Sequence, residues 1–162
     1  MRHLAASLLL ASATAYAAAP PHQLDMVDFF TGKTHAENVM KAAFQGTKSL
    51  VADSVGGKGD RGDFVLVDTV NEQGKPVRTR KWIMHPVGPN HFTGSLSDAI
   101  GPVDIMVNGD SATIRYLMRD GHVNIVQQIQ LQPGGKSLSN HVVARKFGMV
   151  VAHIDGTIRK LD

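Results

Sequence analysis

Cysteine is absent from this chain, and its absence excludes several kinds of chemistry. Without a thiol there are no disulfides, no thiolate metal site, no cysteine nucleophile and no cysteine that could carry a lipid anchor. The stability of the fold must therefore come from its apolar core.

A strong excess of charge of one sign is also absent. The 162 residues include 17 lysines and arginines against 14 aspartates and glutamates, a net charge of +3. The basic residues are not clustered among aromatic residues, as is typical of nucleic-acid-binding proteins, so we expect no nucleic-acid partner. In the densest basic run, Arg78 and Arg80 share one face of a predicted strand and Lys81 lies on the other. We interpret this run as a solvated strand face, with contact to anionic lipid or another polyanion as the alternative.

Long apolar runs are missing except at the N-terminus. After a short basic start, residues 4–13 are apolar and are followed by the small-x-small pattern Ala15-Tyr16-Ala17. About ten apolar residues are too few to cross roughly 30 Å of hydrocarbon, and the pattern is typical of a secretory signal peptide. We therefore predict a signal peptide at residues 1–17. The protein would be secreted across the inner membrane into the periplasm, without a lipid anchor.

Motifs for nucleotide binding and catalysis are incomplete. The Gly-Lys-Thr at residues 32–34 and the Gly-Lys-Ser at 135–137 resemble the end of a phosphate-binding loop, but both lack the required earlier glycine. No Gly-x-Ser-x-Gly sequence is present, and Asp98, Asp104 and Asp155 are too scattered to indicate an acid–base pair. We expect a non-enzymatic protein without a cofactor, with an enzyme acting on an apolar substrate as the less favoured alternative.

The histidines after the predicted signal peptide do not form a metal-binding pattern. None of them is spaced as His-x-His or His-x-x-x-His. We interpret them as surface residues or residues with a satisfied partner, and we predict no metal site. A haem or metal site that uses His141 or His153 is the less favoured alternative.

Alternation of apolar and polar residues is what the chain has in abundance, most clearly at residues 91–131. Ile125 and Ile129 share one strand face, and asparagine and glutamine side chains occupy the other. Turn signals with glycine lie at residues 108–110 and 120–121. A strand with one dry face and one wet face is typical of an antiparallel sheet.

Strand and turn signals repeat at short intervals over the rest of the chain. Residues 18–23 are a predicted flexible leader, residues 24–30 a short helical turn that closes one end, and residues 56–62 a flexible loop. A helix is the alternative for residues 36–44. Such spacing is typical of an all-β sandwich or barrel, here a single domain at residues 24–162. We predict about nine or ten strands, at residues 35–45, 47–55, 64–70, 77–85, 92–96, 103–107, 112–118, 122–132, 138–147 and 150–159.

Two side chains on inward faces stand out. Gln127 lies on an apolar face between two isoleucines, where an amide without a partner would cost about 1–3 kcal/mol. It could form a hydrogen bond inside the core, point into a ligand cavity or be turned outward by a bulge. Trp82, with Arg80 and Met84 on the same strand face, could plug one end of a barrel or line a pocket.

Several short patterns occur in a characteristic order along the chain. They are Phe30-x-Gly32-Lys33-Thr34, Arg80-x-Trp82-x-Met84, Phe92-x-Gly94-Ser95-x-x-Asp98-x-x-Gly101, Tyr116 within its strand, Leu131-Gln132, Asn140, Lys146-Phe147-Gly148 and Ile158-Arg159-Lys160. Together they resemble a domain-of-unknown-function family of small proteobacterial envelope proteins that is grouped with the lipocalin-like (calycin) barrels. The resemblance implies an antiparallel lipocalin-like barrel of about eight to ten strands, an envelope location and an association with membrane-lipid metabolism.

The chain departs from that family in two respects. Many members resemble lipoproteins, whereas this chain has no cysteine to lipidate. Members also carry an acidic pair and a tryptophan in the strand that here contains Val126, Gln127 and Gln128. A function of that cluster would be lost or altered in this chain.

These observations predict an exported lipocalin-like protein that binds a small apolar or lipid-like ligand in the cell envelope. Peripheral contact with the envelope membrane is a further expectation. The alternative is a structural or interaction module with a packed core, closed by Trp82 and Phe92. Strand face, size and the adaptability of methionine indicate seven candidate ligand-binding residues, namely Trp82, Met84, Tyr116, Met118, Ile125, Gln127 and Phe147.

Overall fold

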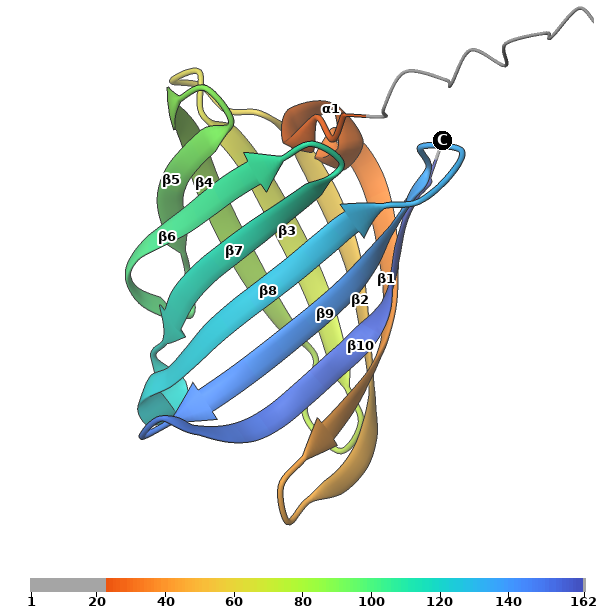
Figure 1. Cartoon of the computed structure of the whole chain (residues 1–162), viewed down its shortest axis with the longest axis vertical. Coiled ribbons are helices and arrows are strands. Elements are labelled where there is room, and N and C mark those ends of the chain that lie inside the picture. Colours follow the sequence, from red (N-terminus) through yellow and green to blue (C-terminus); the bar gives the residue numbers. More distant parts are fainter. Residues whose placement is uncertain (1–22, 162) are drawn as a thin grey trace, which may run out of the picture.

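A computed structural model describes residues 23–161 as a closed antiparallel β-barrel of ten strands with one short α-helix (Figure 1). Each strand pairs with its neighbour in sequence, and the last strand, β10, pairs with the first, β1. The predicted all-β antiparallel barrel is therefore confirmed. The predicted signal peptide at residues 1–17 lies outside the described residues.

The elements follow one another with short turns. Their bounds are α1 Met26–Phe30, β1 Gly32–Ala42, β2 Gly46–Lys58, β3 Phe64–Glu72, β4 Arg78–Gly88, β5 His91–Leu96, β6 Ala99–Asn108, β7 Ser111–Met118, the 3₁₀ turn Asp120–His122, β8 Val123–Leu131, β9 Ser137–Lys146 and β10 Met149–Leu161.

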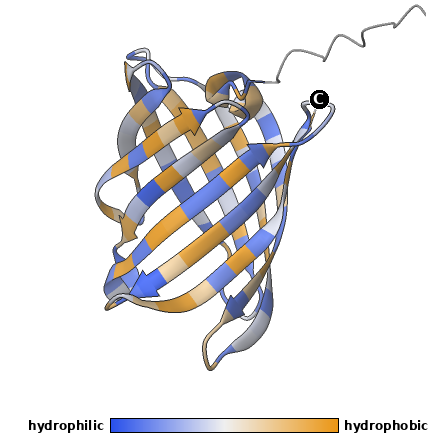
Figure 2. Cartoon of the chain, in the orientation of Figure 1, coloured by the Kyte–Doolittle hydropathy of each residue, from blue (hydrophilic) through white to orange (hydrophobic). Residues whose placement is uncertain are grey.

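Burial alternates along the strands, because successive side chains of a strand point to opposite faces. In β3 every second residue from Phe64 to Glu72 is buried, and the residues between them are more exposed. The same alternation appears as bands of hydrophobic and hydrophilic colour across the barrel wall (Figure 2). One side of every strand therefore faces the barrel interior, and the sequence determines which side chains are presented there.

The predicted helical turn near residues 24–30 is confirmed as α1, which covers one end of the barrel (Figure 1). Asp25 caps it by accepting a hydrogen bond from the Asp28 amide at 2.9 Å. Met26, Phe29 and Phe30 are buried and belong to the hydrophobic core. The helix thus closes one mouth of the barrel with apolar side chains. The described residues contain no helix, this one included, that is long and apolar enough to cross a membrane.

The predicted first strand is confirmed and its helical alternative at residues 36–44 is excluded, since residues 32–42 form β1 between β2 and β10. One expectation about the next strand is corrected. The predicted loop at 56–62 begins later, because Gly56 and Gly57 continue β2. A side chain at Gly56 would place its Cβ 2.1 Å from the Phe30 carbonyl oxygen. Glycine is therefore needed there for the close approach of α1, and is not a sign of a flexible loop.

Candidate functional site

The barrel encloses a cavity of about 720 Å³. It begins beneath α1, where Met26 and Phe30 line it, and reaches the β1–β2 turn at the opposite end, where Phe44 and Gln45 line it. Phe44 is fully exposed, so this end is the open mouth of the cavity. The volume lies within the range of roughly 300–1,000 Å³ that is usual for small-molecule sites.

The end of the cavity beneath α1 is apolar. Leu66 on β3 lies close to Phe30 at Gly56, where β2 and α1 make their tight approach, and Met84 on β4, opposite Phe64 of β3, also lines the cavity. Ala36 and Ile158, which face each other on β1 and β10, continue the apolar wall. Polar side chains line the part of the cavity farther from α1, so the two ends differ in chemistry.

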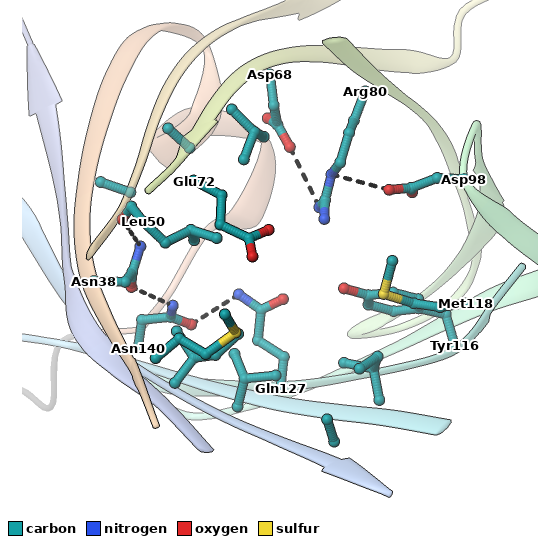
Figure 3. A pocket seen from close by; sticks show the side chains of 18 of the residues that line it. Asn38, Leu50, Asp68, Glu72, Arg80, Asp98, Tyr116, Met118, Gln127 and Asn140 are labelled. Carbon is teal, nitrogen blue, oxygen red and sulfur yellow. Dashed lines mark hydrogen bonds and ion pairs between the residues drawn. The ribbon is translucent and has the colours of Figure 1, made fainter. Parts of the chain in front are cut away.

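An arginine and two aspartates form a charged part of the wall (Figure 3). Arg80 on β4 places its Nη2 3.4 Å from Asp68 Oδ2 and its Nε 3.9 Å from Asp98 Oδ2. Asp68 also accepts hydrogen bonds from Trp82 Nε1 at 2.8 Å and from Ser54 Oγ at 2.9 Å. We call Asp68, Arg80 and Asp98 the Arg80 cluster.

Asp98 differs from Asp68 because its carboxylate accepts no hydrogen bond from the described residues. Both of its carboxylate oxygens are buried, and no residue in the described chain donates a hydrogen bond to either of them. The Nε of Arg80 is likewise buried without a hydrogen-bond acceptor. Leaving such groups unsatisfied costs about 1–3 kcal/mol each, and more when the group is charged. These atoms therefore offer unused hydrogen-bonding capacity to a ligand in the cavity.

The position of Asp98 is fixed by the backbone of the turn between β5 and β6. Ser97 in that turn donates its amide to the Lys81 carbonyl at 2.9 Å, and its hydroxyl accepts from the Lys81 amide at 3.0 Å. The Asp98 carbonyl accepts from the Arg119 amide at 2.9 Å. The carboxylate is thus held at the cavity by bonds from β4 and from the end of β7.

Aromatic rings adjoin the Arg80 cluster. The guanidinium carbon of Arg80 lies 5.1 Å from the centre of the Trp82 ring, and Trp82 packs edge-on against Tyr116 at 5.6 Å. Burial raises the pKa of the Tyr116 hydroxyl above its usual value, although the charge of Arg80 opposes this shift. Burial lowers the pKa of Arg80, but Tyr116, Asp68 and Asp98 outweigh it and raise that pKa above its ordinary value. Arg80 is therefore charged, and Tyr116 is neutral and able to donate.

A chain of amide side chains crosses another part of the wall (Figure 3). Gln127 on β8 donates from Nε2 to Asn140 Oδ1 at 2.8 Å, and Asn140 on β9 donates from Nδ2 to Asn38 Oδ1 at 2.8 Å. Asn38 on β1 donates to the Leu50 carbonyl at 3.4 Å. A backbone carbonyl can only accept, so this last bond sets the direction of the whole chain. The amide oxygen of Gln127 is left as the terminal acceptor.

An acidic residue near the mouth is neutralised by two cations. Glu72 is only 4% exposed, and its carboxylate lies 3.0 Å from Lys75 Nζ and 3.2 Å from Arg78 Nη1. Burial raises the pKa of Glu72, but the hydrogen bonds and charges of Lys75 and Arg78 outweigh burial and hold that pKa below its usual value. The Oε1 of Glu72 accepts no hydrogen bond from the described chain, but unlike the carboxylate of Asp98 it lies within 3.0 Å of an ammonium, and its partner oxygen accepts from Arg78.

Six of the seven residues expected from the sequence to bind a ligand line this cavity. Gln127 does so while also forming the internal hydrogen bond that was considered as an alternative. Phe147 does not, and the prediction that it faces the interior is wrong. Its side chain is 87% exposed, because β9 ends at Lys146 and Phe147 enters the turn with a positive φ of 51°. The residues that line the cavity as expected are Trp82, Met84, Tyr116, Met118, Ile125 and Gln127.

The prediction that Arg78 and Arg80 lie on a solvated strand face is also wrong. Both residues line the cavity, on the same side of β4 as Trp82. Arg78 and Arg80 share a strand face with Trp82 and Met84, and this pattern indicates an inward position. The prediction instead followed the general preference of arginine for solvent. The carboxylates of Asp68 on β3 and Asp98 in the β5–β6 turn make this inward position tolerable. The alternation of residues within β4 does not show that both carboxylates lie beside Arg80.

Histidines on the barrel wall have carboxylate partners. The Nδ1 of His35 lies 2.6 Å from Asp53 Oδ1, and the Nε2 of His91 lies 2.7 Å from Asp104 Oδ1. These contacts agree with the interpretation of the histidines as residues with satisfied partners. Within residues 23–161, no three histidine or acidic side chains are grouped as a metal ion would require.

Comparison with known proteins gives a family and a fold. Residues 4–160 match the model of a family described as "Protein of unknown function (DUF3833)". Curated proteins include none that is significantly similar in sequence.

Two solved structures resemble the barrel. The structure of an S-type phycobiliprotein lyase from Guillardia theta matches with a TM-score of 0.67 at 4% identity, covering 84% of this chain and 90% of that one. A protein of unknown function of the DUF3598 family from Nostoc punctiforme matches with a TM-score of 0.57 at 10% identity, covering 87% of this chain and 51% of that one. At these identities the likeness concerns the fold alone.

Proposed function

Since the chain belongs to the DUF3833 family of proteins of unknown function, its role must be inferred from its site, and we propose that it binds a small, largely apolar molecule inside the barrel. The cavity of about 720 Å³ is the observation that carries this proposal. A barrel of this strand number can hold one small ligand or be filled by its own side chains, and here the side chains leave a ligand-sized space.

The arrangement of the wall supports binding more than a packed module. A module with a closed core was expected to use Trp82 as a plug, but Trp82 lies in the side wall, where its indole donates to Asp68. Methionines at positions 26, 40, 84 and 118 line the cavity and can adapt to a flexible apolar ligand. A few polar groups on an otherwise apolar wall are the usual composition of a small-molecule site.

The proposed role is binding and not catalysis. The titratable groups of the wall are engaged in ion pairs or kept uncharged. Glu72 is paired with Lys75 and Arg78, and burial keeps the Tyr116 hydroxyl protonated. We further propose that the ligand is lipid-like and that the protein acts in the periplasm after export. The apolar end beneath α1 supports the first point, and the signal-peptide pattern of residues 1–17 supports the second.

Contact with a membrane is part of this proposal, because the open end of the barrel carries exposed apolar side chains. Phe44 in the β1–β2 turn is fully exposed, and Phe147 in the β9–β10 turn is 87% exposed. The Ala43 amide donates to the Val151 carbonyl at 2.9 Å, which places these two turns at the same end. Lys41 and Lys146 lie beside them, so the surface combines aromatic rings with cations, as lipid-binding surfaces do.

Filling the cavity tests the proposed function. Ala144 on β9 faces the cavity, and the substitution Ala144→Phe would occupy part of its volume. We expect the wild-type protein to bind the fluorescent apolar probe N-phenyl-1-naphthylamine, and the variant to bind it about tenfold or more weakly through steric overlap. Fluorescence titration measures both affinities.

Val143→Phe is the matched control, since Val143 is the neighbouring residue on the opposite face of the same strand. It should bind the probe as the wild type does. Equal binding by the Ala144→Phe variant, or no binding by the wild type, would overturn the proposal.

A further inference from the structure

We infer that the polar end of the ligand is a neutral hydroxyl-bearing headgroup, received by Asp98 and Arg80, with the apolar tail lying toward α1. This inference rests on the proposed function and specifies the chemistry of its ligand. It follows from the unsatisfied atoms of the Arg80 cluster, from the charge of that cluster and from the direction of the amide chain.

The unsatisfied atoms require both a donor and an acceptor from the ligand. The two oxygens of Asp98 need hydrogen-bond donors, and Arg80 Nε needs an acceptor. Arg80 Nε and Asp98 Oδ2 are 3.9 Å apart, too far for a direct hydrogen bond. A hydroxyl oxygen beside this gap can accept from Arg80 and donate to Asp98 at the same time. An ammonium can only donate and a carboxylate can only accept, so each would satisfy one side.

The charge of the cluster disfavours an anionic headgroup. Arg80 is the single cation between Asp68 and Asp98, so the three side chains together carry one net negative charge. Lys75 and Arg78, farther toward the mouth, already form ion pairs with Glu72 and so do not offset this negative charge. A ligand carboxylate or phosphate would therefore approach Asp98 with like charge in a poorly solvated site, which is unfavourable.

The amide chain supplies a second acceptor. Its direction leaves the Gln127 oxygen as the terminal acceptor in the same cavity (Figure 3). This oxygen comes from β8 and the Asp98 carboxylate from the β5–β6 turn, and both can accept hydrogen bonds from a ligand. A headgroup with two hydroxyls, such as a vicinal diol, could satisfy more of these positions than a single hydroxyl.

The distribution of polarity along the cavity sets the orientation of the ligand. The wall beneath α1 is formed by apolar residues such as Phe30, Leu66 and Met84, whereas the Arg80 cluster lies farther from the helix. An alkyl chain would therefore enter first, and the hydroxyl end would stop at Asp98.

The test compares three ten-carbon probes that differ only at the polar end, namely 1,2-decanediol, decylamine and decanoate, below their aggregation concentrations at pH 7. Isothermal titration calorimetry on the wild-type protein, expressed from the full chain, measures each affinity. We expect the diol to bind most tightly, decylamine less tightly and decanoate at least about tenfold more weakly than the diol. This ranking needs no variant and so does not depend on the folding of one.

The Asp98→Asn variant tests the assignment to Asp98. No residue among 23–161 donates a hydrogen bond to that carboxylate, so the variant should fold, as circular dichroism would show. We expect the preference for the diol over decanoate to shrink at least about fivefold, because the amide removes the negative charge and one acceptor. Asp104→Asn is the control, since it removes the same charge from the outer wall beside His91 and should leave the preference unchanged.

Each other result has a definite meaning. Tightest binding of decanoate, tightest binding of decylamine, or equal binding of all three would overturn the hydroxyl assignment and leave the proposed function in place. A preference that survives in Asp98→Asn would likewise overturn the assignment. Failure of all three probes, together with N-phenyl-1-naphthylamine, to bind the wild type would overturn the proposed function itself.

Discussion

At the scale of the residue, two aspartates beside the same arginine have different roles. Asp68 accepts bonds from Trp82 and Ser54 and lies 3.4 Å from Arg80, so its carboxylate is part of the folded structure. Asp98 receives no hydrogen bond from the described chain. The same side chain thus stabilises the fold in one position and stays available for a ligand in the other.

This contrast predicts different stability effects. We expect Asp68→Asn to lower the free energy of unfolding by about 2 kcal/mol, because it leaves a buried guanidinium with a single, more distant carboxylate and weakens the bond from Trp82. Asp98→Asn should change it by less than about 1 kcal/mol. Urea unfolding followed by the fluorescence of Trp82 measures both. A larger loss for Asp98→Asn than for Asp68→Asn would contradict these roles.

At the scale of the element, the turns at the open end carry residues that do not serve folding. Phe44 and Phe147 both adopt a positive φ, 64° and 51°, a conformation that is uncommon for residues other than glycine and asparagine. Both rings are exposed, so neither gains burial in return. A membrane surface is the environment in which such rings would be buried.

Replacing both rings tests this contact. The double variant Phe44→Asn, Phe147→Asn should fold, because asparagine tolerates a positive φ better than phenylalanine does. We expect its binding to vesicles containing phosphatidylglycerol to fall at least about fivefold relative to the wild type, because two aromatic anchors are lost. Co-sedimentation measures the bound fraction.

Val87→Asn is the control for this experiment. Val87 is 52% exposed and lies near the end of β4, at the opposite end of the barrel from the two turns. Its substitution should leave vesicle binding unchanged. The proposed orientation would be contradicted if Val87→Asn lost as much vesicle binding as the double variant, or if the double variant bound vesicles as well as the wild type does.

At the scale of the whole molecule, the proposed location depends on export. We predict that expression of the full chain in a Gram-negative host yields a periplasmic protein whose N-terminus is Ala18, as intact mass spectrometry would show. Leu9→Arg places a charge in the apolar segment and should keep the protein in the cytoplasm at its full mass, whereas Leu9→Ile should be exported. Cytoplasmic wild-type protein of full mass would contradict this prediction.

The sequence by itself determined the fold class, the helical turn that covers one end of the barrel and most of the inward-facing apolar positions. These features are local, because a side-chain period of two and the turn signals between strands are read over a few residues. For the same reason the inward direction of Gln127 was predictable from its isoleucine neighbours.

Only the tertiary structure decided the chemistry of the interior. Whether Arg80 faces water or a cavity depends on Asp68 and Asp98, which the pairing of β4 with β3 and with β5 brings to it from β3 and from the β5–β6 turn. The exposure of Phe147 likewise depends on where β9 ends and its turn begins. The cavity volume is a property of all ten strands together, because it is set by how completely their side chains fill a closed barrel.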